Sequence, residues 1–269
     1  MKIILNKYDL IKFINKEKNL GFVPTMGAIH LGHISLIKKS ISQCDKTVVS
    51  IFINKPQFNK KSDYKNYPRV VNKDISILKK LKVDCLFIPK ENDIYEDGLN
   101  KKIQISNFKN KLCGKFRPGH FEAVVDVVDK FIKIIKPKNI YFGEKDMQQL
   151  KIIEHFIKKN KIKTKVIGCR TIREKNGIAY SSRNFLLTKK QKTIASKIYK
   201  FLQNKKTNLA SNKKILLKAR KNISLLGASK IDYLEVLDIN KLIKQKRKKA
   251  KYRIFISYYL GRVRLIDNI

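Results

Sequence analysis

Short runs of apolar and β-branched residues alternate with amphipathic segments between residues 20 and 170. The clearest run spans residues 47–53 and is almost continuously apolar, which fits a parallel strand buried on both faces. Segments such as 70–82 and 119–135 carry apolar residues at helical spacing. We therefore expect an α/β fold with a doubly wound parallel sheet. Ligands of such sheets bind at the carboxyl ends of the strands.

This alternation stops after about residue 175. Two segments with helical patterns and two with strand patterns follow, over residues 188–202, 211–226, 231–237 and 253–260. We therefore expect two domains, a larger one over residues 1–175 and a smaller α+β domain over residues 176–269.

The stretch P-T-M-G-A-I-H-L-G-H, residues 24–33, lies between a strand-like run and a helical segment. Gly27 and Gly32 allow the backbone to approach a ligand closely or to adopt a positive φ. His30 and His33 are one helical turn apart, so both can face the same ligand. A helix N-terminus favours anions through its free N–H groups and its dipole. The stretch indicates phosphate binding, although alone it also fits a connection with two incidental histidines.

The net charge of +41 is extreme, and a positive charge favours nucleic-acid binding. The lysines, however, are spread over nearly every predicted helix. The densest basic run, Lys241 to Arg253, fits a solvated face or loop better than a specific polyanion site. We therefore expect nucleic-acid binding to be at most nonspecific.

No apolar run approaches the roughly 20 residues that span a bilayer. Polar residues interrupt the N-terminal stretch too early for a signal peptide. Cys44, Cys85, Cys113 and Cys169 form neither a C-x-x-C pair nor a dense framework, which indicates free thiols. We therefore expect a cytoplasmic protein without membrane attachment.

Asn54 and Gln57 follow the buried run over residues 47–53. An amide offers both a donor and an acceptor, which suits the hydroxyls and carboxylate of a small polyhydroxy acid. An ordinary turn held by Asn and Pro is the alternative.

The segment F-G-E-K-D-M-Q-Q-L, residues 142–150, combines several functional groups. Gly143 lets the backbone approach a sugar or base, and Lys145 supplies a point charge for phosphate. Asp146 can accept hydrogen bonds from ribose or cap the following helix, and Gln149 can turn toward the same site. A charged surface turn is the alternative.

Ser181, Ser182 and Arg183 place two hydroxyls and a guanidinium in succession between the two predicted domains. All three side chains can donate hydrogen bonds to phosphate, and arginine can do so bidentately. The segment therefore predicts a phosphate clamp, with a polar linker as the alternative.

Together, five blocks resemble those of the pantoate–β-alanine ligase (pantothenate synthetase) family. The blocks are residues 24–33, the S-I-F-I-N-K-P-Q-F of residues 50–58, the R-P-G-H-F of residues 117–121, residues 142–150 and the S-S-R-N of residues 181–184. The H-x-G-H element alone is similar to the wider nucleotidyltransferase superfamily, which includes class I aminoacyl-tRNA synthetases. The longer block is much more specific.

The resemblance implies a Rossmann-like fold of the nucleotidyltransferase type. It implies ATP-dependent condensation of pantoate with β-alanine to pantothenate through a pantoyl-adenylate, with release of AMP and pyrophosphate. Catalytic roles are implied for His30, His33, Lys145 and Arg183. Nucleotide contacts are implied for Met26, Gly27, Ala28, Ile29, His30, Leu31, Gly32, His33, Gly143, Glu144, Lys145, Asp146, Ile172, Tyr180, Ser181, Ser182 and Arg183. Pantoate contacts are implied for Asn54, Gln57 and Gln149, and Gln57 also for β-alanine.

The same resemblance implies magnesium bound with ATP, and a homodimer. Asp74 is the single acid kept from an acidic run of the family and is a weak candidate for a place near magnesium, with helix capping or a salt bridge as the alternative. The chain departs from the family at Pro56, which could displace its loop, at Met147, which replaces an aromatic as a packing change, and at Arg170 and Tyr180, which could alter loop stiffness.

Two other functions fit parts of the sequence. Another nucleotidyltransferase, such as an adenylyltransferase acting on a cofactor precursor, would share H-x-G-H but not the N-x-x-Q-F and G-E-K-D-x-Q-Q blocks. A nucleic-acid-binding protein is favoured by charge alone and predicts salt-sensitive binding. No RNA-recognition signature supports it.

Overall fold

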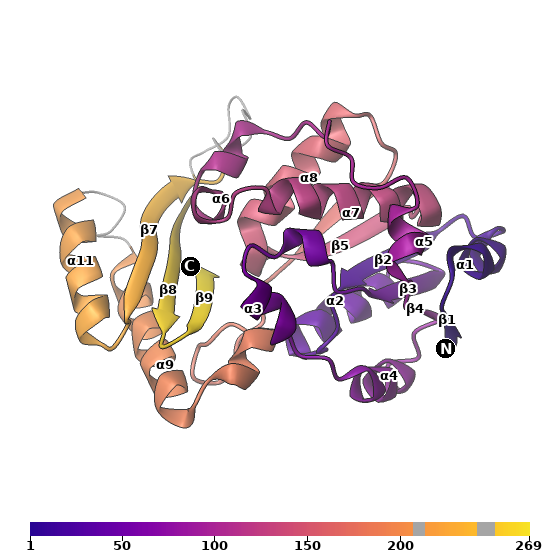
Figure 1. The fold of residues 1–269 in the computed structure, drawn as a ribbon. Helices are drawn as coiled ribbons and strands as arrows, with labels where there is room; N and C mark the ends of the chain where they lie inside the picture. Colours follow the sequence, from indigo (N-terminus) through magenta and orange to yellow (C-terminus); the bar gives the residue numbers. More distant parts are fainter. Residues whose placement is uncertain (207–212, 241–250) are drawn as a thin grey trace.

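The computed structural model describes residues 1–206, 213–240 and 251–269, which form two lobes side by side (Figure 1). In these residues the larger lobe holds a six-stranded parallel sheet in the order β1-β4-β3-β2-β5-β6, and the smaller lobe an antiparallel sheet in the order β7-β8-β9. The expected doubly wound α/β fold with a smaller α+β part is therefore confirmed. The strands are β1 (Lys2–Ile4), β2 (Leu20–Thr25), β3 (Lys46–Ile51), β4 (Cys85–Phe87), β5 (Asn139–Gly143), β6 (Lys165–Cys169), β7 (Lys230–Asp238), β8 (Tyr252–Leu260) and β9 (Val263–Asn268).

Helices connect and cover these strands. The α-helices are α1 (Lys7–Ile14), α2 (Leu31–Ile41), α3 (Lys61–Lys65), α4 (Val71–Lys80), α5 (Glu91–Tyr95), α6 (Cys113–Phe116), α7 (His120–Ile135), α8 (Met147–Lys159), α9 (Lys189–Asn204) and α11 (Lys213–Leu225). Short 3-10 helices are η1 (Lys55–Gln57), η2 (Asn107–Asn110), η3 (Glu144–Asp146) and η4 (Ser182–Leu186).

Each face of the parallel sheet has its own hydrophobic core, because successive side chains of a strand point to opposite faces. Phe22 and Phe87 pack with α1, α7 and α8, whereas Val23 and Leu86 pack with α2 and α4. A strand covered on both faces has no polar side to expose. This arrangement explains why the central strands are almost continuously apolar in sequence.

The antiparallel sheet also uses both faces. Leu234 and Ile256 pack against α9 and α11 in the core of the smaller lobe. Tyr233 and Phe255 point the other way and join the hydrophobic core that contains Phe22. The two lobes therefore share apolar contacts beneath the site that lies between them.

The sequence pattern did not predict β1 and β9, which lie at the edges of their sheets. β1 has three residues, and β9 alternates apolar with charged or polar side chains in the order V-R-L-I-D-N. The first helix, α1, begins at Lys7, because the Asn6 side chain caps it by accepting a hydrogen bond from the Asp9 N–H.

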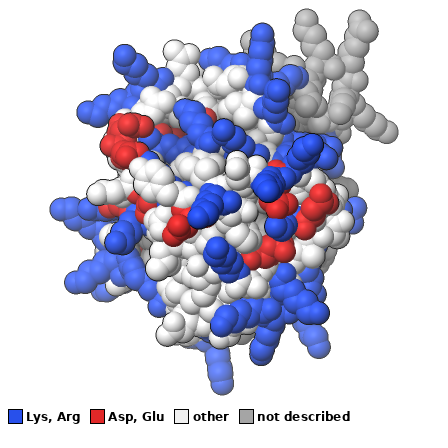
Figure 2. All heavy atoms as spheres, turned by 90° about the vertical axis from the view of Figure 1, so that its right-hand side faces the viewer, with Lys and Arg blue, Asp and Glu red and all other residues white. Residues whose placement is uncertain are grey.

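No helix in the part of the chain that the structure describes is long and apolar enough to cross a membrane. Lysine and arginine are scattered over the face drawn in Figure 2, with acidic residues between them, rather than gathered in one patch. Most of the basic run from Lys241 to Arg253 lies outside the described residues.

Candidate active site

The carboxyl ends of β2, β3 and β5 meet at one edge of the parallel sheet. β2 pairs with β3 as far as Thr25 and Ile51, but its pairing with β5 ends at Phe22 and Ile140. β2 and β5 are therefore unpaired beyond this point, where the strand order reverses and α/β sheets bind ligands. A cavity of about 1120 Å³ opens here and reaches the smaller lobe. We call it the switch-point cavity.

Most of the residues predicted from the sequence line this cavity. They are Met26, His30, Gly32, His33, Asn54, Gln57, Gly143, Lys145, Asp146, Gln149, Ile172, Tyr180, Ser181, Ser182 and Arg183. Others do not line it, namely Gly27, Ala28, Ile29, Leu31, Asp74 and Glu144. Segments far apart in the sequence thus supply polar and charged groups to one enclosed space.

The loop after β2 is held by side chains of its own lobe. Thr25 accepts a hydrogen bond from the Gly27 N–H at 3.1 Å. Gly27 and Ala28 both adopt positive φ, 79° and 52°, which strains alanine but not glycine. The Asp74 carboxylate accepts from the Ala28 and Ile29 N–H groups at 2.8 and 2.7 Å. These bonds hold the loop in a conformation that alanine would not otherwise adopt.

The position of Asp74 does not support the suggested place near magnesium. Its side chain is 1% exposed, and each carboxylate oxygen accepts a backbone N–H. Burial raises its pKa, while the two N–H donors act in the opposite direction. Asp74 therefore holds the loop after β2 from behind and does not line the cavity.

His30 and His33 stack on each other at the start of α2, with ring centroids 4.0 Å apart. Burial and the nearby Lys145 lower the pKa of His30 to about 4, and burial and His30 lower that of His33 well below its usual value. Both rings are therefore neutral at pH 7. His30 Nδ1 accepts from the His33 N–H at 3.4 Å, which leaves the ring proton on Nε2. The pair offers hydrogen-bond donors to a ligand rather than positive charge.

The amide pair after β3 divides into a ligand-facing and a supporting side chain. Asn54 is 1% exposed. Its Nδ2 donates to Gln57 Oε1 at 3.1 Å and to the Ala123 carbonyl at 3.2 Å, and its Oδ1 accepts from the Tyr95 hydroxyl at 2.6 Å. Asn54 is thus occupied by protein and orients Gln57. Pro56 is accommodated within η1, which keeps this contact.

Arg117 and His120 support the same segment. His120 Nδ1 donates to the Gln57 carbonyl at 2.8 Å, and Arg117 donates to that carbonyl at 3.1 Å and to His120 Nε2 at 2.9 Å. Burial and Arg117 lower the pKa of His120 well below its usual value, and burial lowers that of Arg117 to about 10. His120, the histidine of the R-P-G-H-F block, therefore has a structural role as a neutral ring that holds the Gln57 main chain.

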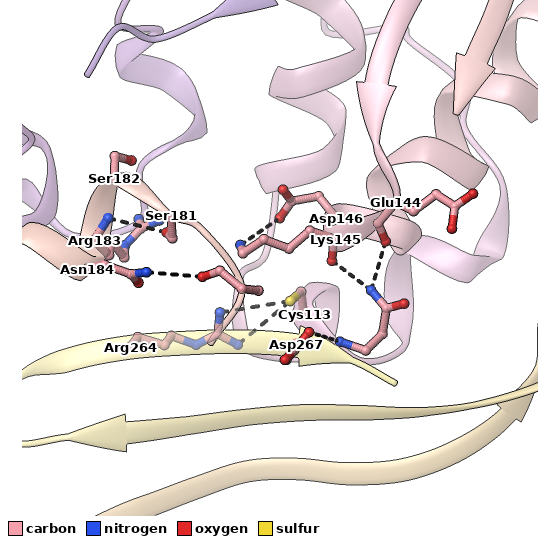
Figure 3. A network of polar contacts seen from close by, with 12 residues as sticks. Cys113, Glu144, Lys145, Asp146, Ser181, Ser182, Arg183, Asn184, Arg264 and Asp267 are labelled. Atoms are coloured by element: carbon pink, nitrogen blue, oxygen red, sulfur yellow. Dashed lines mark hydrogen bonds and ion pairs between the residues drawn. The ribbon is translucent and has the colours of Figure 1, made fainter. Parts of the chain in front are cut away.

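The loop after β5 sends two of its charged side chains toward the cavity and one away from it (Figure 3). Lys145 Nζ lies 3.8 Å from Asp146 Oδ1. Glu144 instead forms an ion pair with Arg253 at 2.7 Å and does not line the cavity. Asp146 precedes α8 without capping it through its side chain, contrary to expectation. Gln149, in the first turn of α8, lines the cavity.

The predicted phosphate clamp already has partners within the protein. The Ser182 hydroxyl lies 3.1 Å from the Tyr67 hydroxyl. Ser182 as a whole residue is 6% exposed. Arg183 pairs with Asp63 at 2.9 Å, and Ser181 accepts from the Arg183 N–H at 3.2 Å. Arg183 is thus paired before any nucleotide binds, and a phosphate would compete with Asp63 for it.

Asp63 and Arg264 also line the cavity, although no motif of the sequence pointed to either of them. Arg264 lies on β9, donates to Asp232 at 2.7 Å and approaches Cys113 Sγ to within 3.8 Å. A charged residue inside a strand pattern is the signal that could have identified Arg264. Nothing in the sequence pattern distinguishes Asp63 from other surface acids.

Comparison with known proteins identifies relatives over nearly the whole chain. The family model described as pantoate-beta-alanine ligase matches residues 3–269. A pantothenate synthetase of Francisella tularensis subsp. novicida is 45% identical over 257 residues, covering 94% of this chain and 90% of the relative. One of Flavobacterium psychrophilum is 41% identical over 269 residues, covering 98% and 95%. The crystal structure of pantoate-beta-alanine ligase from Francisella tularensis, complexed with beta-gamma ATP and beta-alanine, superimposes with a TM-score of 0.86 at 43% identity, covering 100% and 97%.

Proposed function

The chain belongs to the pantoate–β-alanine ligase family, and we propose that its switch-point cavity carries out the ATP-dependent joining of pantoate to β-alanine. One observation carries this proposal: the H-x-G-H histidines, the amides Gln57 and Gln149, and the Lys145 ammonium line one cavity. Phosphate-binding and hydroxy-acid-binding groups thus lie together at the switch point of the sheet. An adenylyltransferase acting on another acceptor would not require the two amides.

A carboxylate is a poor acyl donor, so the first step activates it. An oxygen of the pantoate carboxylate attacks the α-phosphorus of ATP, and the bond from that phosphorus to the bridging oxygen breaks. The products are pantoyl-adenylate and pyrophosphate. The β-alanine amine then attacks the acyl carbon, loses a proton, and AMP leaves with the bonding electron pair. The products are pantothenate and AMP.

Negative charge collects on phosphate oxygens during the first step, and preorganised donors stabilise it. Lys145 and Arg183 supply positive charge at the cavity, and the Ser181 and Ser182 hydroxyls supply donors. His30 and His33 are neutral, so they act as N–H donors to phosphate oxygens. In the free protein His33 holds no extra proton at pH 7, so the catalytic role that we assign to it is this hydrogen bond.

Gln57 and Gln149 are the groups we assign to pantoate, and Gln57 also to β-alanine. Asn54 donates to the side-chain oxygen of Gln57, and Arg117 and His120 hold its main-chain carbonyl, so the Gln57 amide is held at one place in the cavity. A fixed amide aligns the pantoate carboxylate with the α-phosphate, which converts an encounter into a positioned attack. Gly143, Asp146 and Ile172 are assigned to ribose and adenine.

Magnesium enters this proposal with the nucleotide. The described residues contain no group of three or more His, Cys, Asp or Glu side chains that could hold a metal ion. Mg²⁺ at nucleotide sites is bound largely by substrate phosphates and water, together with one or two carboxylates. The cavity fits a metal that ATP holds in this way, because Asp146 places an acidic side chain there, beside Lys145. When bound, it neutralises charge on the leaving pyrophosphate.

Three further assignments extend the proposal. We place the enzyme in the cytoplasm, in keeping with four unpaired cysteines. We expect a homodimer, which sedimentation equilibrium tests directly. We assign nucleotide and pantoate binding to residues 1–175 and a lid function to residues 176–269, whose Arg183 and Arg264 line the cavity.

The test is exchange of label between pyrophosphate and ATP in the presence of pantoate, without β-alanine. Exchange that depends on pantoate supports reversible formation of the acyl-adenylate. Pantothenate formation after β-alanine is added completes the assignment. If all three substrates with magnesium give neither exchange nor pantothenate from folded protein, the proposed activity is wrong.

A further inference from the structure

The C-terminal strand reaches the loop that carries Lys145. The Asn268 side chain donates from Nδ2 to the carbonyls of Glu144 and Lys145, both at 2.8 Å. Its Oδ1 accepts from Arg253 at 2.6 Å, and Arg253 also pairs with the Glu144 carboxylate at 2.7 Å. One buried amide therefore binds two successive carbonyls of η3 and is itself held by a guanidinium. We call Asn268 on β9 and Arg253 on β8 the C-terminal clamp.

The clamp is anchored on its own side. Asp267 forms a two-bond ion pair with Arg173 at 2.6 and 2.9 Å, and Arg173 also donates to the Asn268 carbonyl at 3.1 Å. Beyond β9, Ile269 continues the pairing with Ile254 through two backbone hydrogen bonds of 3.0 Å. Asn268 is 3% exposed. A side chain held this way cannot relax to follow a loop that moves, so the loop must adopt the position that the strand dictates.

The Lys145 side chain has little to fix it within its own lobe. In the described part of the chain, its one carboxylate partner within 4 Å is Asp146, at 3.8 Å. Its side chain is 17% exposed and points toward the cavity (Figure 3). The direction in which the ammonium enters the cavity therefore depends on the backbone of η3, and two carbonyls of η3 are bound by Asn268.

We propose that Asn268 is a positioning residue for Lys145, so that the C-terminal strand sets where the ammonium meets the triphosphate of ATP. This inference rests on the proposed function for the role of Lys145. It adds that Asn268, in the smaller lobe, affects the reaction by holding the loop after β5 in the larger lobe, without contacting substrate. Arg253 acts in the same direction by holding the Asn268 amide with its NH₂ group toward the loop.

A double-mutant cycle tests this coupling. Asn268→Ala should lower kcat about 10-fold, since small displacements of a catalytic group are costly, and should leave KM for pantoate within about twofold. In the Lys145→Ala background the same substitution should lower kcat by less than about twofold, because a residue that acts through Lys145 has nothing left to position. The dissociation constant for ATP, measured by calorimetry, should follow the same pattern.

Two further variants keep the test interpretable. Asn268→Asp is isosteric and still accepts from Arg253, but it has no NH₂ group for the two carbonyls, so it should reproduce the loss even if Asn268→Ala folds poorly. Asn222→Ala changes an exposed asparagine of α11 in the same lobe and should leave kcat and ATP binding unchanged.

The outcomes separate the two proposals. Equal losses in both backgrounds, or no loss from Asn268→Ala and Asn268→Asp, overturn the positioning role. If the unmodified protein binds ATP but forms no pantothenate, the proposed function fails while the cycle on ATP affinity still decides the positioning role. If it binds no ATP, the role of Lys145 and the clamp proposal fail together.

Discussion

Two loops at the same edge of the sheet are held in different ways. The loop after β2 is fixed within its own lobe, because Asp74 on α4 binds the N–H groups of Ala28 and Ile29. The loop after β5 is fixed from the other lobe, because Asn268 on β9 binds the carbonyls of Glu144 and Lys145. A carboxylate holds donors in the first case, and an amide holds acceptors in the second.

The two loops therefore contribute different properties to the site. The β2 loop provides a fixed backbone shape, and the β5 loop provides a positive charge. The β2 loop has a strained backbone that Asp74 of its own lobe holds, and it carries two neutral histidines. The β5 loop carries the Lys145 ammonium, and its position depends on contact with the smaller lobe. Substitutions behind the first loop should therefore affect stability most, and substitutions behind the second should affect turnover most.

The largest effect is expected at Lys145 itself. Lys145→Ala should lower kcat about 100-fold or more, the scale seen when one preorganised donor to a charged transition state is removed. Lys145→Arg keeps the charge but changes its geometry, so it should recover part of the loss. Steady-state pantothenate formation measures both. Near-normal turnover of Lys145→Ala would remove this residue from the mechanism and with it the charge that distinguishes the β5 loop.

The next effect concerns the β2 loop. Asp74→Ala leaves two buried N–H groups without an acceptor and a strained alanine without support, so the free energy of unfolding should fall by about 3 kcal/mol. Urea denaturation measures this change. Asp74→Asn keeps one acceptor oxygen and should lose about half as much. If Asp74→Ala is as stable as the parent protein, the β2 loop does not depend on this carboxylate. The proposed difference in how the two loops are held would then be wrong.

A smaller effect is expected for Gln57, the amide that we assign to pantoate. Gln57→Ala should raise KM for pantoate about 10-fold, the cost of roughly one well-placed hydrogen bond in a desolvated site, and leave the dissociation constant for ATP within about twofold. Initial rates against pantoate concentration and calorimetry with ATP measure the two quantities. Unchanged pantoate dependence would count against the assignment of Gln57. If Gln57→Ala weakens ATP binding as well, the substitution has disrupted the loop rather than removed one contact.

The fold was predictable where burial imposes a simple pattern. The central strands are covered on both faces, so their sequences are continuously apolar, and α7 carries its apolar residues at helical spacing. β1 and β9 were missed because three residues carry no period, and because β9 places Arg264 and Asp267 in polar contacts of the site. Polar residues that make such contacts interrupt the alternation of apolar and polar residues by which a strand is recognised in a sequence.

The site was predictable in its parts but not in its support. Local motifs gave His30, Gln57 and Lys145, which line the cavity. The residues that hold them come from distant segments: Asp74 is 46 positions from Ala28, and Asn268 is 123 positions from Lys145. No local spacing encodes such contacts. For the same reason the motifs could not show that Glu144 turns away from the cavity toward Arg253.

The Arg183–Asp63 pair offers a finer test of where positive charge is available. Asp63→Asn removes a competitor for the guanidinium, so ATP should bind up to about threefold tighter, because partly exposed ion pairs contribute little. Calorimetry at low and high salt measures this, and the gain should shrink as salt rises. Asp97→Asn, at an exposed acid away from the cavity, is the control. Weaker binding by Asp63→Asn would mean that Asp63 orients Arg183 instead of competing for it.

The smallest expected effect is an absence of titration at the β2 loop. The pKa of His30 lies near 4 and that of His33 well below its usual value, so neither ring should gain a proton between pH 8 and pH 6. Unfolded histidine titrates near 6.5. Between about pH 4 and pH 6.5 the unfolded chain therefore binds a proton that folded His30 does not, and the free energy of unfolding should fall as pH falls through this window.

Ring carbon chemical shifts in NMR spectra of the free protein, assigned with His30→Gln and His33→Gln, measure the titration directly. If either ring titrates near pH 6.5, positive charge is available on both loops, and the division into a neutral β2 loop and a charged β5 loop is wrong.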